Sequence, residues 1–583
     1  MPTFEPPDPY DALRVQHLFV EMRGSATETR ERLARALDEV GGAGWALAPK
    51  PRVAPWAPSS IAWRVVPPDI DTERTLEVRP EEAWTLAHAL ARRIDGEVEP
   101  VFKGDVLAPM ADTPREALEG VADQGPPPKV GWHLDALRVI GASGAHAIFA
   151  QRHPGRLPGE GVLIGHPDTG YTKHKEIWAT QDGPIDPMHG NNYLEPGKGP
   201  LDPMKGGAGE QPGHGTSTSS VMVARPKVKV PSGVAGVPGN VDLLGIAPGA
   251  RVAPYRVTKS VVILGWQSRL AAAIELAVES GCRVISMSLG GLGGNELDWA
   301  SETAEAKGVI VVAAAGNYFP FVVAPANHAK VVGCAATGPD DRAWAHSARG
   351  FAVKITAPGH LVWVAGWDGK TAIARLGSGT SFATAAVASS AALWLSYHGA
   401  AIKKADPTAA MFRAALKRAA RRVDGLSRDQ FGPGILDVAA LLRIPLDDLR
   451  ADVSMERVGP LEAIAPATGE PALSRMARHE LEMHRLLDPE LACDGAAAQL
   501  EGLTSTPTPP RASSGLSLEL EKARLSRAPE RSGGTQAPAP DVAHVKQGTA
   551  TDARPPQHQA GGETSAATIT LEIVLEIEIS VSR

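Results

Sequence analysis

Between residues 160 and 395, short apolar segments alternate with segments of helical periodicity, and this alternation limits the fold more than any other feature. Val284–Leu289 and Val309–Ala315 are apolar almost throughout, which is typical of strands buried on both faces. Residues 266–279 and 297–307 instead read as helices, the first with an apolar stripe at Leu270, Ile274 and Val278. The chain is therefore predicted to contain an α/β domain, with a parallel sheet covered by helices on both faces.

Three short polar motifs fall where such strands end and helices begin. Asp168 follows the apolar run 161–165 in an Asp-Thr-Gly turn, and His214 lies between two glycines. Ser381 lies in the glycine-rich turn Gly377–Thr384, ahead of an apolar helix. Singly, these residues fit a turn carboxylate, a helix-cap histidine and an N-cap serine. Together and in this order, they predict a nucleophilic serine with a base and an orienting carboxylate.

These motifs resemble those of the subtilisin-like serine proteases, the subtilases, in which the same chain order of Asp, His and Ser is found. Ala313–Asn317 is similar to the segment that carries the oxyanion-hole asparagine of this family. The resemblance covers roughly residues 130–440. It implies a subtilisin-like fold and a serine endopeptidase that acts on extended peptides or unfolded proteins.

The resemblance also implies a role for each matched residue. Ser381 would attack the peptide carbonyl, His214 would take and return the proton, and Asp168 would fix the imidazole tautomer without becoming protonated. The Asn317 side-chain amide and the Ser381 backbone N–H would stabilise the oxyanion. A left-handed turn residue after Gly316 is the structural alternative for Asn317.

Two segments resemble the substrate-binding parts of the family. Ser286–Gly291 matches the substrate-binding strand, and an exposed edge there would pair with an extended peptide through Ser288, Leu289 and Gly290. The primary specificity pocket would be lined by small residues, namely Ala314, Ala315 and Gly316. Neither segment contains an acidic residue, so a preference for uncharged, apolar substrate side chains is expected.

Two residues depart from the family pattern. Pro167 precedes Asp168, and a proline lacks the N–H that a central strand needs, so the strand is expected to end one residue early or to bulge there. Ala385 stands where the family usually has a proline. The loss of this proline should be tolerated, with looser packing behind Ser381 as one consequence.

Calcium sites are frequent in the family, but only Glu176 matches one ligand position and no ligand loop is recognisable. No metal ion or other cofactor is therefore expected, with calcium left open. Other histidines in the domain are interpreted as structural or surface residues: His166, His174, His328 and His346.

Residues 14–104 have the element order β-α-β-β-α-β, which predicts a ferredoxin-like α+β domain. Ser25-Ala-Thr-Glu28 forms a capping box at the start of its first helix. The domain also resembles the prodomains of subtilisin-like proteases, which chaperone folding and then inhibit. An intramolecular inhibitor is therefore expected, and an ordinary accessory domain is the alternative.

The remaining chain divides by composition. Hydrophobic residues make up 43%, charged residues 21% and the net charge is −7, which favours a soluble globular protein without a nucleic-acid or membrane partner. The segment before Arg14 has four prolines and no apolar run, so no signal peptide and a cytoplasmic location are expected, with unconventional export left open.

The expected divisions are a disordered N-terminus (1–13), the ferredoxin-like domain (14–104), a linker (105–130), the protease domain (131–442), a helical extension (443–502), a disordered Pro/Ser/Ala-rich linker (503–567) and a C-terminal strand (568–583).

Residues 568–583 alternate apolar and polar positions with a period of two, as a half-buried strand does. A lone strand is unstable, so this tail is expected to add to a sheet edge, the N-terminal domain being the first choice. A free tail kept soluble by its glutamates is the alternative.

Two other functions use the same residues. A peptide ligase or acyl-transferase would form the same acyl-enzyme, and a non-catalytic peptide-binding module would keep the fold alone. The complete catalytic set argues against the binding module, because such a module has no need of it.

Overall fold

The structure is a computed structural model that describes residues 14–40, 45–50, 60–66, 80–103, 128–130, 132–134, 142–174, 177, 183–207, 210–225, 229–458, 479–480 and 482–483. Glu176, Cys493, the disordered segments expected at 1–13 and 503–567 and the C-terminal strand lie outside these residues. None of the helices described is long and apolar enough to cross a membrane.

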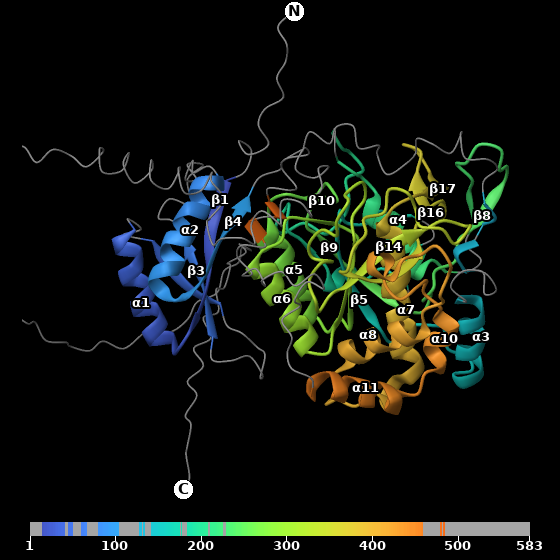
Figure 1. Ribbon diagram of the computed structural model, residues 1–583. Coiled ribbons are helices and arrows are strands. Elements are labelled where there is room, and N and C mark those ends of the chain that lie inside the picture. Colours follow the sequence, from blue (N-terminus) through green and yellow to red (C-terminus); the bar gives the residue numbers. More distant parts are fainter. Residues whose placement is uncertain are drawn as a thin grey trace, which may run out of the picture. The chain divides into compact units, whose positions relative to one another are not determined.

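The N-terminal domain is a four-stranded antiparallel sheet with strand order β2-β3-β1-β4, which confirms the ferredoxin-like topology. Figure 1 shows both helices on one face of this sheet. Ser25 caps the first helix by accepting a hydrogen bond from the Glu28 N–H at 3.2 Å, as the capping box predicts. The elements are β1 (Arg14–Arg23), α1 (Ala26–Glu39), β2 (Ala46–Lys50), β3 (Ser60–Val66), α2 (Pro80–Ile94) and β4 (Gly96–Lys103).

The second sheet has seven parallel strands and forms the centre of the α/β domain, as predicted. Their burial is almost complete, since helices cover both faces. In spatial order the strands are β15 (Val353–Pro358), β14 (Val332–Thr337), β13 (Ile310–Ala314), β11 (Val284–Met287), β5 (Leu163–Asp168), β9 (Arg251–Arg256) and β6 (Asn191–Asn192).

Two apolar cores lie on the two faces of this sheet, because successive side chains of a strand point to opposite sides. One core contains Ile164, Val284 and Val312 with helices α3 (Ala142–Arg152), α4 (His214–Val223) and α7 (Thr380–His398). The other contains Tyr255, Ile285 and Val311 with α5 (Gln267–Glu279) and α6 (Asn295–Ala306) (Figure 1). Cys282 and Cys334 are buried free thiols, one in each core.

Short strand pairs and C-terminal helices complete the domain. The chain breaks at Ile444-Pro445 between two helices, α10 and α11, and α11 packs against α8 in the first core. The helices are α8 (Thr408–Ala419), α9 (Arg428–Phe431), α10 (Val438–Arg443) and α11 (Leu446–Val458). The pairs are β7 (Lys229–Pro231) with β8 (Asn240–Asp242), β10 (Val262–Ile263) with β12 (Gly290–Gly291), and β16 (Val362–Trp367) with β17 (Ala372–Gly377).

Pro167 neither ends nor bulges its strand, so that expectation is wrong. β5 runs through to Asp168 and stays in register with β9, pairing Pro167 with Tyr255 and Asp168 with Arg256. The other neighbour, β11, pairs with β5 only at Ile164 and Gly165. The missing N–H is therefore tolerated, because the strand has already lost one partner before the proline.

Candidate active site

Asp168 ends β5 and lies fully buried at the carboxyl end of the sheet. Its Oδ1 accepts hydrogen bonds from the Thr169 N–H at 2.7 Å and from His214 Nδ1 at 2.8 Å. Burial alone would raise the pKa of the carboxyl, but the charge of His214 and hydrogen bonds from His166 and His214 hold this pKa well below its usual range. Asp168 is therefore an ionised carboxylate that binds the imidazole of His214.

His214 is the first residue of α4, and both flanking glycines are needed to bring it to Asp168. Gly213 adopts a left-handed φ of 80°, and its N–H donates to Asp202 Oδ2 at 2.7 Å. A Cβ on Gly215 would lie 2.1 Å from the Gly170 carbonyl oxygen, so only glycine allows α4 to approach the Asp-Thr-Gly turn this closely. The Gly215 N–H also donates to Thr169 Oγ1 at 3.2 Å, which ties the two motifs together.

Ser381 lies in the first turn of α7, after the cap residue Gly379. Its Oγ donates to the Ser288 carbonyl oxygen at 3.2 Å, and Ser288 Oγ donates to the Ser381 carbonyl oxygen at 2.9 Å. Helix α4 packs against α7, and the His214 and Phe382 rings lie 6.5 Å apart between centroids. The structure thus brings the histidine to the helix start that carries the serine.

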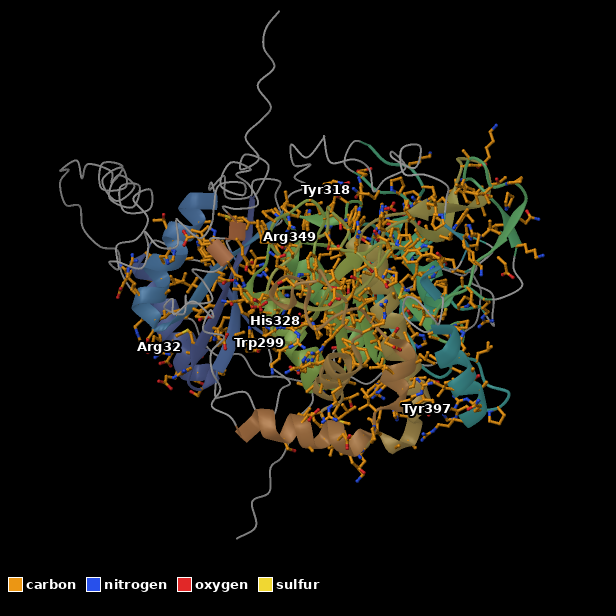
Figure 2. The ribbon with its side chains drawn as sticks, turned by 45° about the vertical axis from the view of Figure 1, so that its right-hand side comes forward. Arg32, Trp299, Tyr318, His328, Arg349 and Tyr397 are labelled. Atoms are coloured by element: carbon orange, nitrogen blue, oxygen red, sulfur yellow. The ribbon has the colours of Figure 1, made fainter. Side chains whose placement is uncertain are left out.

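Asn317 follows β13 and is held by the residue before Ser381. Its Oδ1 accepts hydrogen bonds from the Thr380 N–H at 2.9 Å and from Thr380 Oγ1 at 2.8 Å, and Thr380 Oγ1 accepts from the Gly316 N–H at 3.2 Å. With its oxygen bound in this way, the side-chain NH₂ points away from Thr380. The residues with positive φ here are Gly316 and Tyr318, the latter labelled in Figure 2, so the turn alternative for Asn317 is wrong.

The expected substrate-binding residues lie together beside Ser381. The last residue pair of β11 and β13 is Met287 with Ala313. The next residues of these two neighbouring segments are Ser288 and Ala314. Ala314 and Ala315 are buried, and Gly316 is half-buried. Gly290 was expected to lie on an exposed strand edge that pairs with the substrate. Its N–H instead donates to the Val261 carbonyl oxygen at 3.0 Å, where β12 pairs with β10.

Three further contacts were not predicted from the sequence. Asp202, in a loop without periodicity, accepts from Thr169 Oγ1 at 2.8 Å as well as from Gly213. His166 Nε2 lies 3.4 Å from Asp168 Oδ2. Of these, only His166 left a signal in the sequence, because residues two apart in a strand share a face.

A cavity of about 290 Å³ lies beside the imidazole, lined by α4, the loop before it and the β16–β17 pair. Its walls include His214, Thr172, Met204, Trp367 and Arg375. Among the described residues, no group of three or more His, Cys, Asp or Glu side chains is placed to hold a metal ion.

Comparisons with known proteins identify the family of the chain. Residues 159–434 match the sequence profile of the subtilase family. Thermitase from Thermoactinomyces vulgaris is 30% identical over 277 residues, which cover 46% of this chain and 84% of thermitase. Subtilisin Savinase from Lederbergia lenta is 27% identical over 295 residues, covering 50% of this chain and 94% of Savinase. The solved structure of fervidolysin from Fervidobacterium pennivorans covers 75% of this chain and 62% of its own, with 19% identity and a TM-score of 0.48. The chain therefore belongs to the subtilase family and is a subtilisin-like serine endopeptidase.

Proposed function

We propose that this protein hydrolyses peptide bonds through an acyl-enzyme, with Ser381 as nucleophile, His214 as general base and acid, and Asp168 as the orienting carboxylate. The observation that carries the proposal is the 2.8 Å hydrogen bond between His214 Nδ1 and the buried Asp168 carboxylate, at the start of a helix that packs against the start of α7. Nδ1 donates to Asp168, so Nε2 is the nitrogen that takes the proton of Ser381.

The oxyanion of the tetrahedral intermediate would be stabilised by the Asn317 NH₂ group and the Ser381 backbone N–H. Thr380 supports this role, because it holds the Asn317 amide by its oxygen before the reaction begins. Donors fixed in advance need no reorganisation when charge develops.

The proposed substrate is an extended peptide or an unfolded protein segment with an uncharged residue at the scissile bond. The small, uncharged side chains of Ala314 and Ala315, with Gly316, support this preference. A fluorophosphonate probe should label Ser381, and a peptide library should be cleaved after uncharged residues. Mass analysis of the products separates hydrolysis from ligation, because ligation joins the acyl fragment to an added amine, and a chain that neither labels nor cleaves would be a binding module.

We further propose that the N-terminal domain is an intramolecular inhibitor. The Trp266 N–H, at the start of α5, donates to the carbonyl oxygen of Phe102 near the end of β4 at 2.8 Å. Phe102 packs in one apolar cluster with Leu264, Leu292 and Val323. The last strand of the domain therefore ends beside β10 and β12, next to the proposed substrate strand.

Buried charges hold the N-terminal sheet to the start of α6. Glu296 is fully buried and accepts hydrogen bonds from His17 at 2.9 Å, from Lys50 at 2.7 Å and from Arg64. The Asn295 N–H donates to Glu99 Oε2 at 2.5 Å, a position where the helix dipole favours a carboxylate. Next to these charges, Phe19 meets the edge of Trp299, labelled in Figure 2, at 6.0 Å between centroids.

The inhibitor proposal predicts self-cleavage of the linker. The wild-type chain should be cut between Phe102 and Val130, and Ser381→Ala should stay intact, as mass spectrometry of the purified chains can show. Residues 14–104 with part of the linker, added in trans, should inhibit the cleaved enzyme. A fully active wild type without any cut in this region would make the domain an accessory one.

The buried charges also predict how pH affects this association. Burial would raise the pKa of Glu296, but hydrogen bonding to His17 and the charges of His17, Lys50 and Arg64 hold this pKa well below its usual range. The stabilisation is therefore present above the unpaired pKa of about 4.3 and is lost as the pH falls. In an inactive Ser381→Ala protease domain prepared without the N-terminal domain, Glu296→Gln should weaken binding of the separately added domain by about two to three orders of magnitude near neutral pH, since it removes one partner of a buried ion cluster. Titration calorimetry that finds equal affinity for both proteins between pH 4 and pH 7 would contradict this expectation.

A further inference from the structure

A second imidazole lies on the carboxylate of Asp168, opposite His214. His166 precedes Asp168 by two residues in β5, so both side chains lie on the same face of the strand. His166 is 1% exposed, and its Nε2 lies 3.4 Å from Asp168 Oδ2. His214 instead has its shorter contact to the other oxygen, with Nδ1 2.8 Å from Oδ1 and 3.1 Å from Oδ2. The two histidines therefore share one carboxylate from different sides.

The neighbours of His166 assign the position of its proton. A lone pair on Nε2 would repel the Asp168 carboxylate, so Nε2 carries hydrogen. Thr218 Oγ1, 3.1 Å from Nε2, donates within its own helix to the carbonyl oxygens of His214 and Gly215, so it accepts from His166. Ser219 Oγ lies 3.4 Å from Nδ1 and can donate to it. The Nε2–H is thus directed at Asp168 Oδ2 and Thr218 Oγ1.

This donor completes the set of hydrogen bonds around Asp168. Oδ1 has the Thr169 N–H and His214, whereas Oδ2 has His166 and the longer contact from His214. The titratable side chains that act on Asp168 are His166 and His214, and Asp202 lies next to this cluster on Thr169 and Gly213. A buried carboxylate with donors on both oxygens cannot rotate without losing one of them, which is costly away from water.

We propose that His166 is a positioning residue, which holds the Asp168 carboxylate in the plane where it orients His214. This inference rests on the proposed catalytic roles of Asp168, His214 and Ser381. It assigns to His166 no contact with the substrate and no proton transfer. Its effect should appear in kcat and in the pH profile, and hardly in KM.

Three substitutions of the full chain test it, because their side chains differ in where they place a donor. His166→Gln can bring its amide NH₂ to the position of Nε2, next to Asp168. His166→Asn is shorter and reaches only the position of Nδ1, next to Ser219. His166→Leu fills the space without any donor. The Gln and Asn variants are a matched polar pair, so they decide the question even where the Leu variant does not fold.

Kinetics on a peptide substrate, with active sites counted by a fluorophosphonate probe, give the readout. Leu and Asn should each lower kcat about tenfold with KM within twofold, as for a weak hydrogen bond to a charged group, and Gln should keep most of the wild-type kcat. Loss of the donor leaves the charge of Asp168 less neutralised, which favours the protonated form of the neighbouring base His214, so the acid limb of kcat/KM should move to higher pH for Leu and Asn and stay in place for Gln.

Wild-type kcat and pH profile for both Leu and Asn would overturn the inference. Equal losses for Gln and Asn, with an unshifted acid limb, would also overturn it, because they indicate a packing role alone. Ser381→Ala separates this result from a failure of the proposed function. If Ser381→Ala is inactive while the His166 variants behave as wild type, only the positioning role is wrong, whereas an active Ser381→Ala chain removes the catalytic roles themselves.

Discussion

Ser381→Ala is expected to abolish fluorophosphonate labelling and to lower peptide hydrolysis by several orders of magnitude. The Ser381 Oγ is the atom that would form the acyl bond, and no other hydroxyl at the start of α7 can replace it, since Thr380 Oγ1 is bound to Asn317. Because the three proposed catalytic residues would act as a unit, adding His214→Ala should cost little more. The measurement is kcat/KM for the single and double variants, with product formation followed over hours.

Ser378→Ala is the matched control, a neighbouring serine in the same turn. Ser378 is also buried, but its Oγ accepts from the Leu361 N–H at 3.1 Å and contacts His360 Nδ1 at 2.8 Å, away from His214. This variant should keep probe labelling. Wild-type turnover in Ser381→Ala, or loss of labelling in the control alone, would show that the nucleophile is misassigned.

The α/β architecture could be predicted because the burial of its strands leaves a strong trace in the sequence. Val284–Met287 and Ile310–Ala314 are almost entirely apolar because both faces of the sheet are covered. The ferredoxin-like topology was predictable for a related reason, since α1 begins at a capping box and buries one stripe, Leu33, Ala36 and Leu37.

The approximate place of the site was also predictable, because Asp168, His214 and Ser381 each lie at a strand end or helix start that the sequence marks with glycine. The sequence could not predict which atoms of these residues contact one another or their neighbours. Asp202 holds Thr169 and Gly213 from a loop without any periodic pattern, so its role depends on the folded path of that loop. The hydrogen bond from the Gly290 N–H to the Val261 carbonyl oxygen also depends on tertiary structure, because the sequence around Gly290 alone predicts an exposed edge.

Pro167 and His166 show a different limit. The prediction for Pro167 applied the rule for a strand with two neighbours, but the number of neighbours at one residue depends on where β11 stops pairing. His166 was interpreted as a structural or surface residue, because the sequence of a strand does not show which residue a histidine side chain contacts. The sequence shows that His166 lies two residues before Asp168. The contacts of His166 with Thr218 and Ser219 of α4, which direct its N–H at Asp168, are seen only in the folded structure.

Asn317→Ala is expected to lower kcat by about 10²–10³, the effect of removing one oxyanion-hole donor. KM should change little, because the amide would stabilise charge that develops only in the transition state. The size of the loss depends on how firmly the amide is held, and here Thr380 holds its oxygen with both the N–H and Oγ1. Stopped assays under substrate saturation, with active sites counted by the probe, give kcat directly.

Thr380→Val tests whether this fixation matters, since valine keeps the shape of threonine and removes the hydroxyl. The backbone N–H of residue 380 would still bind Asn317 Oδ1, but the 2.8 Å bond from Oγ1 and the 3.2 Å bond from the Gly316 N–H would be lost. We expect kcat to fall by about tenfold, between wild type and Asn317→Ala, and Thr380→Ser to restore most of it by returning the hydroxyl. The Thr380→Val, Asn317→Ala double variant should be no slower than Asn317→Ala, because Thr380 would act only through the amide. An additive loss in the double variant would mean that Thr380 supports Ser381 directly, and a wild-type kcat for Asn317→Ala would remove Asn317 from the oxyanion hole.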